Sequence, residues 1–150
     1  MIEVHEQFTV PTGVDDVWAV LSDPYAVVEC VPGAQLGPKR DDGSFDAKLQ
    51  VKFGPMNVAF QLAVTVELDA AAKQGRLTAR GKDNQGGARV QSQAAFRVEE
   101  HPPCSLVSVD GQVEISGRLA SLIEGGAGAV VKSMSRQFGE RLAARCVAAA

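Results

Sequence analysis

The apolar residues of this chain change their spacing once, and that change limits the possible folds more than any other feature. Up to Ile115 they mostly alternate with polar residues, as in half-buried strands, and from about Leu119 to Ala148 they recur at helical spacing. A sheet with one apolar face and one long amphipathic helix bury these faces against each other. The sequence therefore predicts an α+β fold in which the final helix covers the sheet.

Seven segments carry the strand pattern, and turn-forming residues such as Asp41-Asp42-Gly43 and Gly54-Pro55 separate them. They are Ile2 to Val10, Leu36 to Arg40, Ser44 to Phe53, Val58 to Leu68, Arg76 to Lys82, Ala88 to Glu99 and Ser105 to Ile115. The second of them has the weakest pattern. Because short turns join most of the consecutive segments, we expect hairpins and hence a seven-stranded antiparallel sheet.

Two short helices are expected between the first strand and the rest of the sheet. Thr12 can cap a helix whose apolar face lies within residues 14 to 21, and Asp23-Pro24 ends it. A second helical turn, Tyr25 to Val31, stops at Pro32-Gly33, a dipeptide typical of tight turns.

The final helix combines an apolar stripe with three glycines in its first half. The stripe consists of Ile123, Ala127, Val130, Val131, Met134, Phe138 and Leu142, and Lys132, Arg136, Gly139 and Glu140 lie opposite. Gly125, Gly126 and Gly128 each cost a helix about 1 kcal/mol relative to alanine, so we predict close backbone approach or a cavity-lining bend there.

The whole chain is predicted to form one domain, residues 1–150, built around one core. At about 1.5 Å per residue the final helix spans about 40 Å, the width of such a sheet. A strongly curved sheet around a single helix rarely fills completely, and the unfilled part is the predicted pocket.

Composition and charge exclude several classes of protein. The net charge of −3, from 15 Lys and Arg against 18 Asp and Glu, is scattered along the chain, which argues against nucleic acid as a partner. Cys30, Cys104 and Cys146 are widely spaced and form no zinc motif, so a reducing compartment fits best. The first residues carry neither a signal peptide nor a membrane span, and we therefore expect a cytoplasmic protein.

The candidate ligand-binding residues are the large apolar side chains whose inward faces would surround the final helix. They are Phe53, Met56, Phe60, Leu62, Phe96, Val130, Met134 and Phe138. Each of them alone fits ordinary core packing. Together they form an aromatic and Met-rich lining, which suits a flat apolar ring or an isoprenoid chain.

No catalytic group emerges from the sequence, and we expect no enzyme activity, no metal and no cofactor. His5 falls on the solvent face of the first strand and His101 in a Pro-rich turn, so neither has an evident catalytic partner. Cys30 is expected to be a small buried side chain rather than a reactive thiol. Glu6 falls on the apolar side of its strand, where an unpaired carboxylate is costly, whereas Glu67 is expected in solvent.

Five short motifs follow one another in an order that resembles the CoxG family of carbon monoxide dehydrogenase subunits, within the START-like helix-grip superfamily. They are Val17-Trp18 with Leu21-Ser22-Asp23-Pro24, Cys30-Val31-Pro32-Gly33-Ala34, Val51-Lys52-Phe53-Gly54-Pro55, Gly81-Lys82-Asp83 and Ser116-Gly117-Arg118-Leu119-Ala120. The resemblance covers nearly the whole chain. Its Cys-x-Pro-Gly-Ala and Lys-x-Gly-Pro segments are the more specific parts.

This resemblance implies a non-catalytic binding or carrier domain for an apolar small molecule, a quinone or another lipid. It also implies a molybdenum hydroxylase of the carbon monoxide dehydrogenase type, or its maturation factor, as partner, and peripheral contact with the inner face of the cell membrane. Two alternatives remain open. One is an assembly or membrane-recruitment factor without a ligand, and the other is an enzyme of the cyclase or dehydratase kind, which the superfamily also contains.

Overall fold

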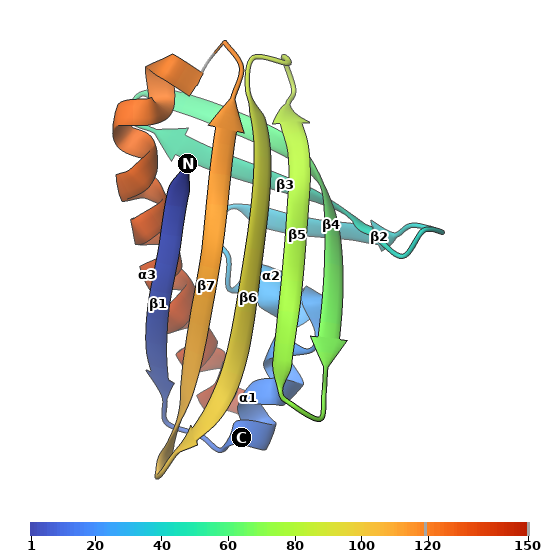
Figure 1. Ribbon diagram of the computed structural model, residues 1–150, viewed down its shortest axis with the longest axis vertical. Helices are drawn as coiled ribbons and strands as arrows, with labels where there is room; N and C mark the ends of the chain where they lie inside the picture. The colour runs from blue at the N-terminus through green and yellow to red at the C-terminus, as the bar shows by residue number, and fades with distance from the viewer. Residues whose placement is uncertain (119, 150) are drawn as a thin grey trace.

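The computed structural model describes residues 1–118 and 120–149, with the side chains of 122–124 and 149 outside the description. Within these residues the chain forms one seven-stranded antiparallel sheet and three helices (Figure 1). The strands are β1 (Ile2–Val10), β2 (Ala34–Lys39), β3 (Phe45–Phe53), β4 (Met56–Asp69), β5 (Gln74–Asp83), β6 (Arg89–His101) and β7 (Cys104–Ser116). The helices are α1 (Val14–Leu21), α2 (Pro24–Glu29) and α3 (Ala120–Ala149). The predicted fold is confirmed.

The sheet is curved, and all three helices lie on its concave side (Figure 1). Its strand order is β1-β7-β6-β5-β4-β3-β2, so the first strand of the chain pairs with the last. In the β1–β7 ladder Ile2 lies opposite Val113 and Val10 opposite Ser105. The other neighbours in the sheet are consecutive strands, as expected for hairpins.

The two short helices begin in different ways. Asp23 caps α2, because its carboxylate accepts a hydrogen bond from the Tyr25 amide at 3.1 Å and Pro24 occupies the first turn. At α1 the prediction was wrong. Gly13 is the N-cap and makes no side-chain cap, while the Thr12 hydroxyl is buried without a hydrogen-bond partner among the described residues.

The glycines of α3 play roles opposite to those predicted. Gly125, Gly126 and Gly128 are exposed, and a Cβ at any of them would meet nothing within 4 Å, so the predicted close backbone approach is wrong. Gly139, assigned to the polar face, is instead buried against Phe8 of β1. The predicted start of the helix at Leu119 and the side chain of Ile123 lie outside the described residues.

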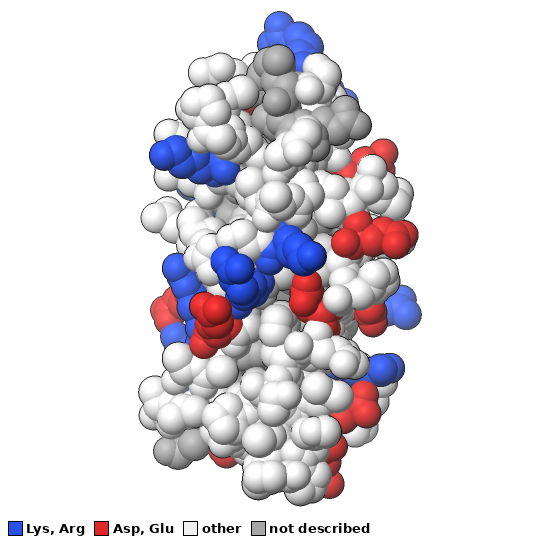
Figure 2. Space-filling view, turned by 90° about the vertical axis from the view of Figure 1, so that its left-hand side faces the viewer, with Lys and Arg blue, Asp and Glu red and all other residues white. Residues whose placement is uncertain are grey.

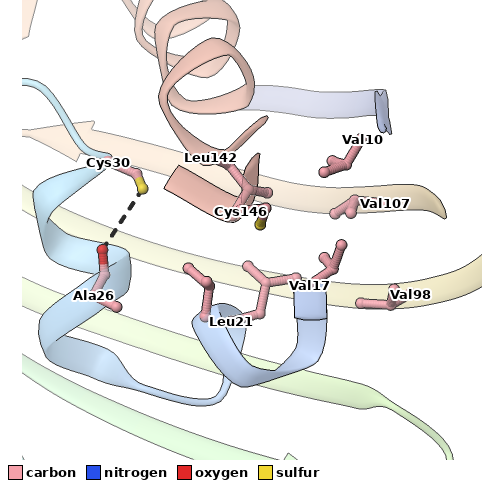
Figure 3. Packing of buried hydrophobic residues seen from close by; sticks show 10 residues of the cluster. Val10, Val17, Leu21, Ala26, Cys30, Val98, Val107, Leu142 and Cys146 are labelled. Carbon is pink, nitrogen blue, oxygen red and sulfur yellow. Dashed lines mark hydrogen bonds between the residues drawn. The ribbon is translucent and has the colours of Figure 1, made fainter. Parts of the chain in front are cut away.

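The core is divided into two apolar clusters. The α1 cluster joins α1 and α2 to the C-terminal half of α3 (Figure 3) and contains Val10, Val17, Val20, Leu21, Ala26, Cys30, Val98, Val107, Leu142 and Cys146. The hairpin cluster joins the β3–β4 hairpin to the N-terminal half of α3 and contains Val51, Phe53, Val58, Phe60, Ala88 and Ala127. The two clusters lie toward opposite ends of the long helix.

The solvent face of α3 is polar in its middle and carries glycines, alanines and Val147 toward its ends. Lys132, Arg136, Glu140 and Arg141 are exposed, and Figure 2 shows basic and acidic groups mixed across the middle of the side of the molecule that it faces. Among the described residues no helix is both long enough and apolar enough to cross a membrane.

Candidate functional site

Helix α3 lies across the concave side of the sheet and comes closest to strands near its two edges. Its backbone approaches β1 at one edge and β3 toward the other, and it also approaches α1. The central strands β4, β5 and β6 run between these contacts. The inner side chains of the central strands therefore decide how completely the space beneath the helix is filled.

Most of the side chains at the centre of this inner face are small. Gly111 of β7 lies opposite Ala94 of β6, which lies opposite Leu77 of β5. In the next cross-strand row Ser92 of β6 lies opposite Ala79 of β5. All five residues are half-buried, so the helices leave the centre of the concave face partly exposed. We call this space the central gap.

The central gap separates the two apolar clusters of the core. Phe96 and Val98 follow Ala94 on β6 and belong to or pack against the α1 cluster. Val90, on the other side of Ser92, packs against the hairpin cluster. On β6, short side chains alone lie between the apolar groups that pack against the two clusters. That the central gap holds a small molecule stays a prediction.

The eight predicted ligand-binding residues flank the central gap at both ends. Phe53 and Phe60 are only 8% and 3% exposed and belong to the hairpin cluster, so they act as core. Met56, Leu62, Val130 and Met134 pack against that cluster, while Phe96 and Phe138 pack against the α1 cluster. The set is therefore brought together in two groups rather than one ring, and its contact with a ligand stays a prediction.

Sequence reasoning missed the residues that make the space. Ala79, Ser92, Ala94 and Gly111 have short side chains, which leave no signature in a search for large apolar groups. The signal that could have found them is their position in the alternating pattern, since each one falls on the inward side of its strand. Space under a helix forms where the facing strands lack large side chains. The small residues come together only when neighbouring strands pair, which the sequence does not show directly.

Glu6 places a carboxylate on the inner face of β1. It lies opposite Val109 of β7 and is half-buried, whereas its neighbours His5 and Gln7 point outward and are exposed. The expectation that Glu6 belongs to the apolar side is thus confirmed, and Glu67 is exposed as expected. Glu6 is a polar group that could orient a ligand by accepting a hydrogen bond.

The two histidines lie away from the gap. On the outer face, His5 Nδ1 lies 2.8 Å from Asp110 Oδ1 and Nε2 lies 3.6 Å from Glu3 Oε2. The hydrogen bond with Asp110, and then that with Glu3, raises the pKa of His5 above its ordinary value of 6.5. His101 ends β6 and is exposed. Among residues 1–118 and 120–149 no cluster of three or more metal-ligating side chains occurs.

All three cysteines are free thiols, and two of them are core residues. Cys30 and Cys146 are 1% and 0% exposed, and burial raises the pKa of both thiols above the ordinary 9.0. The Cys30 Sγ–H donates a hydrogen bond to the Ala26 carbonyl at 3.6 Å (Figure 3). A buried, protonated thiol is a poor nucleophile, so the predicted structural role of Cys30 is confirmed.

A curved seven-stranded antiparallel sheet that holds a long C-terminal helix on its concave side, with two short helices after the first strand, defines the START-like helix-grip class. A conserved protein from Geobacillus kaustophilus has the same fold, with a TM-score of 0.83 and 18% identity over 97% of this chain and 95% of that chain. The ZhuI aromatase/cyclase from Streptomyces sp. R1128 matches with a TM-score of 0.63 and 16% sequence identity. The match covers 96% of this chain and 92% of that chain. A START superfamily protein from Mycobacterium smegmatis matches with a TM-score of 0.60 and 17% sequence identity, over 96% of each chain.

The family follows from the sequence itself. Residues 7–147 match the profile of CoxG, a family of carbon monoxide dehydrogenase subunits, and the chain belongs to that family. A search of curated protein sequences found no match. The solved structures named above share too little sequence identity to show more than the fold.

Proposed function

We propose that this chain is a non-catalytic binding or carrier domain that shields an apolar small molecule in the central gap, with a quinone as the first ligand to test. The proposal is carried by one observation: the middle of the concave face, between two well-packed clusters, is lined by small side chains and remains accessible. Membership of the CoxG family supports an accessory role beside a carbon monoxide dehydrogenase-type molybdenum hydroxylase.

Ligand binding at this site would depend mainly on apolar burial, which contributes about 25 cal/mol per Å² of apolar surface removed from water. Met56 and Met134 are half-buried and flexible enough to adapt to a ring or an isoprenoid chain. Glu6 and Ser92 would supply the few polar contacts that orient such a ligand.

The test is direct detection of ligand on the purified protein. We expect mass spectrometry of an organic extract to find a quinone or lipid, and menaquinone analogues to raise the melting temperature. An extract without such molecules, together with no thermal shift, would contradict the proposal. That result would favour the alternative of an assembly or membrane-recruitment factor without a ligand.

The proposal also includes a cytoplasmic location with peripheral membrane contact, which cell fractionation tests. A second candidate is an enzyme of the cyclase or dehydratase kind. It is favoured by Glu6, a carboxylate on the concave face that could act as a general base. A variant Glu6→Gln that binds a ligand normally but no longer converts it would support this second candidate over the carrier.

A further inference from the structure

The outer face of the sheet, on the side opposite the helices, contains a groove of about 1410 Å³. Its wall includes residues from β2 through β7 together with Arg40 and Asn84 from the adjoining turns. We call it the outer groove. It does not share the central gap's apolar character, because most of its outward-pointing side chains are charged residues or amides.

The outer groove carries four exposed cations besides Arg40. They are Lys48, Arg80, Lys82 and Arg89, and none of them takes part in an ion pair in the part of the chain that the structure describes. Arg40, in contrast, pairs with Asp46. A chain whose formal net charge is −3 therefore concentrates positive charge in its outer groove.

The wall of the outer groove holds five cations and three carboxylates, which leaves a formal net charge of +2. Asp46 is engaged by Arg40, and the buried Asp83 accepts a hydrogen bond from the Ala88 amide at 3.2 Å. Glu114 is the remaining carboxylate of the groove wall; it lies opposite Gln91 and is a diagonal neighbour of Arg89.

The pairing of the strands places like charges beside one another. Lys82 of β5 lies opposite Arg89 of β6, and Arg80 is a diagonal neighbour of Arg89. Like charges in directly opposed cross-strand positions are destabilising, so folding alone does not favour this arrangement. Elsewhere on the same face the cations have acidic neighbours: Arg76 lies opposite Glu67, and Arg97 Nε lies 2.8 Å from Glu99 Oε1.

We infer that the outer groove is a docking surface for an acidic, extended segment of a partner protein. Lys48, Gln61, Lys82 and Arg89 form one cross-strand row, with neighbours about 4.8 Å apart. Carboxylates on one side of an extended chain recur about every 6.4 to 6.8 Å, within reach of these flexible side chains. The amides of Gln35, Gln61 and Gln91 can donate to carboxylates and pair with the backbone of such a segment.

A protein segment fits the outer groove better than a membrane or a nucleic acid does. The cations line the wall of a groove, whereas a flat bilayer favours basic groups that project. Glu114, on the β7 side of the cationic region, would repel a continuous polyanion that ran past it, while a short acidic segment can end before it. On the side shown in Figure 2, in contrast, charges of both signs are mixed. The inference is independent of the ligand proposal, since it concerns the opposite face of the sheet.

The test uses the full chain and a fluorescein-labelled dodecapeptide of alternating Glu and Ser as probe. We expect binding by fluorescence anisotropy that weakens at least fivefold between 50 and 300 mM salt, because exposed charges are screened. The double variant Lys82→Gln/Arg89→Gln should weaken it at least fivefold. The matched control Arg76→Gln/Arg97→Gln, which removes the same charge from the same face, should weaken it less than twofold.

The melting temperatures of both double variants show whether they fold. We expect Lys82→Gln/Arg89→Gln to melt no lower than the natural chain, since it removes a like-charge pair. Equal loss of binding in the two double variants would overturn the inference, as would absence of peptide binding. A third outcome would assign the groove to membranes instead. In that case the natural chain does not bind the peptide but sediments with phosphatidylglycerol vesicles, and Lys82→Gln/Arg89→Gln abolishes this sedimentation.

Discussion

Gly139 of α3 lies so close to Phe8 of β1 that a Cβ at this position would collide with the Phe8 ring. The Phe8 ring in turn packs against Phe138, with ring centroids 6.1 Å apart. The helix therefore packs against the edge strand through contact between the Phe8 ring and the backbone of Gly139. This contact fixes the height of α3 above the sheet at one end of the central gap.

The first prediction concerns this contact. Gly139→Ala should lower the free energy of unfolding by about 1 to 3 kcal/mol, because the new methyl group collides with a ring that is itself packed. Gly128→Ala is the matched control, since a Cβ there meets nothing and alanine favours a helix by up to about 1 kcal/mol. Urea denaturation measures both. Stabilisation by both substitutions would contradict the described packing.

The second prediction tests whether the central gap is open. Ala79→Leu should change the free energy of unfolding by less than about 1 kcal/mol, because the added side chain enters accessible space. Ala127→Leu, in the hairpin cluster at 3% exposure, should cost about 1 to 3 kcal/mol through overpacking. Ala79→Leu should also abolish the thermal shift with menaquinone analogues. Equal destabilisation by both variants would show that the gap is filled.

The third prediction concerns the carboxylate inside the concave face. Glu6→Leu should raise the free energy of unfolding by about 1 kcal/mol, since it replaces a half-buried carboxylate with an apolar side chain among Val4 and Phe8. Glu3→Leu, on the exposed outer face of the same strand, should change it by less than about 0.5 kcal/mol. Thermal and urea unfolding of the two variants check this. A loss of stability in Glu6→Leu would indicate that the carboxylate has a partner.

The fourth prediction concerns the exposed His5–Asp110 pair. The pKa of His5 is raised, so the interaction is complete at pH values below the ordinary 6.5 and is lost as the pH rises through the folded-state pKa. Asp110→Asn should lower the pKa of His5, and Glu3→Gln should lower it less, in the order of the two hydrogen bonds. An NMR titration of the His5 ring measures both shifts. A larger effect of Glu3→Gln would contradict the described geometry.

The sequence predicted the architecture well because alternation and helical spacing are read locally. Each strand and the long helix could be assigned from its own residues, and the inward position of Glu6 followed from the same alternation. The role of Gly139 could not, because it depends on Phe8, which lies far away in the chain. In a periodic pattern, a glycine on the polar side of a helix is indistinguishable from one pressed against a neighbouring strand.

The candidate site was predicted only in part for a related reason. Large apolar residues such as Phe60 and Phe96 stand out in the sequence, and the structure assigns them to two separate clusters. The space between the clusters is defined by Ala79, Ala94 and Gly111, which carry no such mark. The like-charged Lys82 and Arg89, in contrast, adjoin one hairpin, and a residue-by-residue pairing of that hairpin from its turn would have revealed them.

The pairing of β1 with β7 also has a consequence during synthesis. His5 and Asp110 touch across 105 positions of chain, so the first strand emerges from the ribosome long before its partner exists. At about 5 to 20 residues per second, that strand waits roughly 5 to 20 seconds with its apolar face uncovered. The helix that covers it is made later still, so this edge is the part of the nascent chain that most needs protection from premature association.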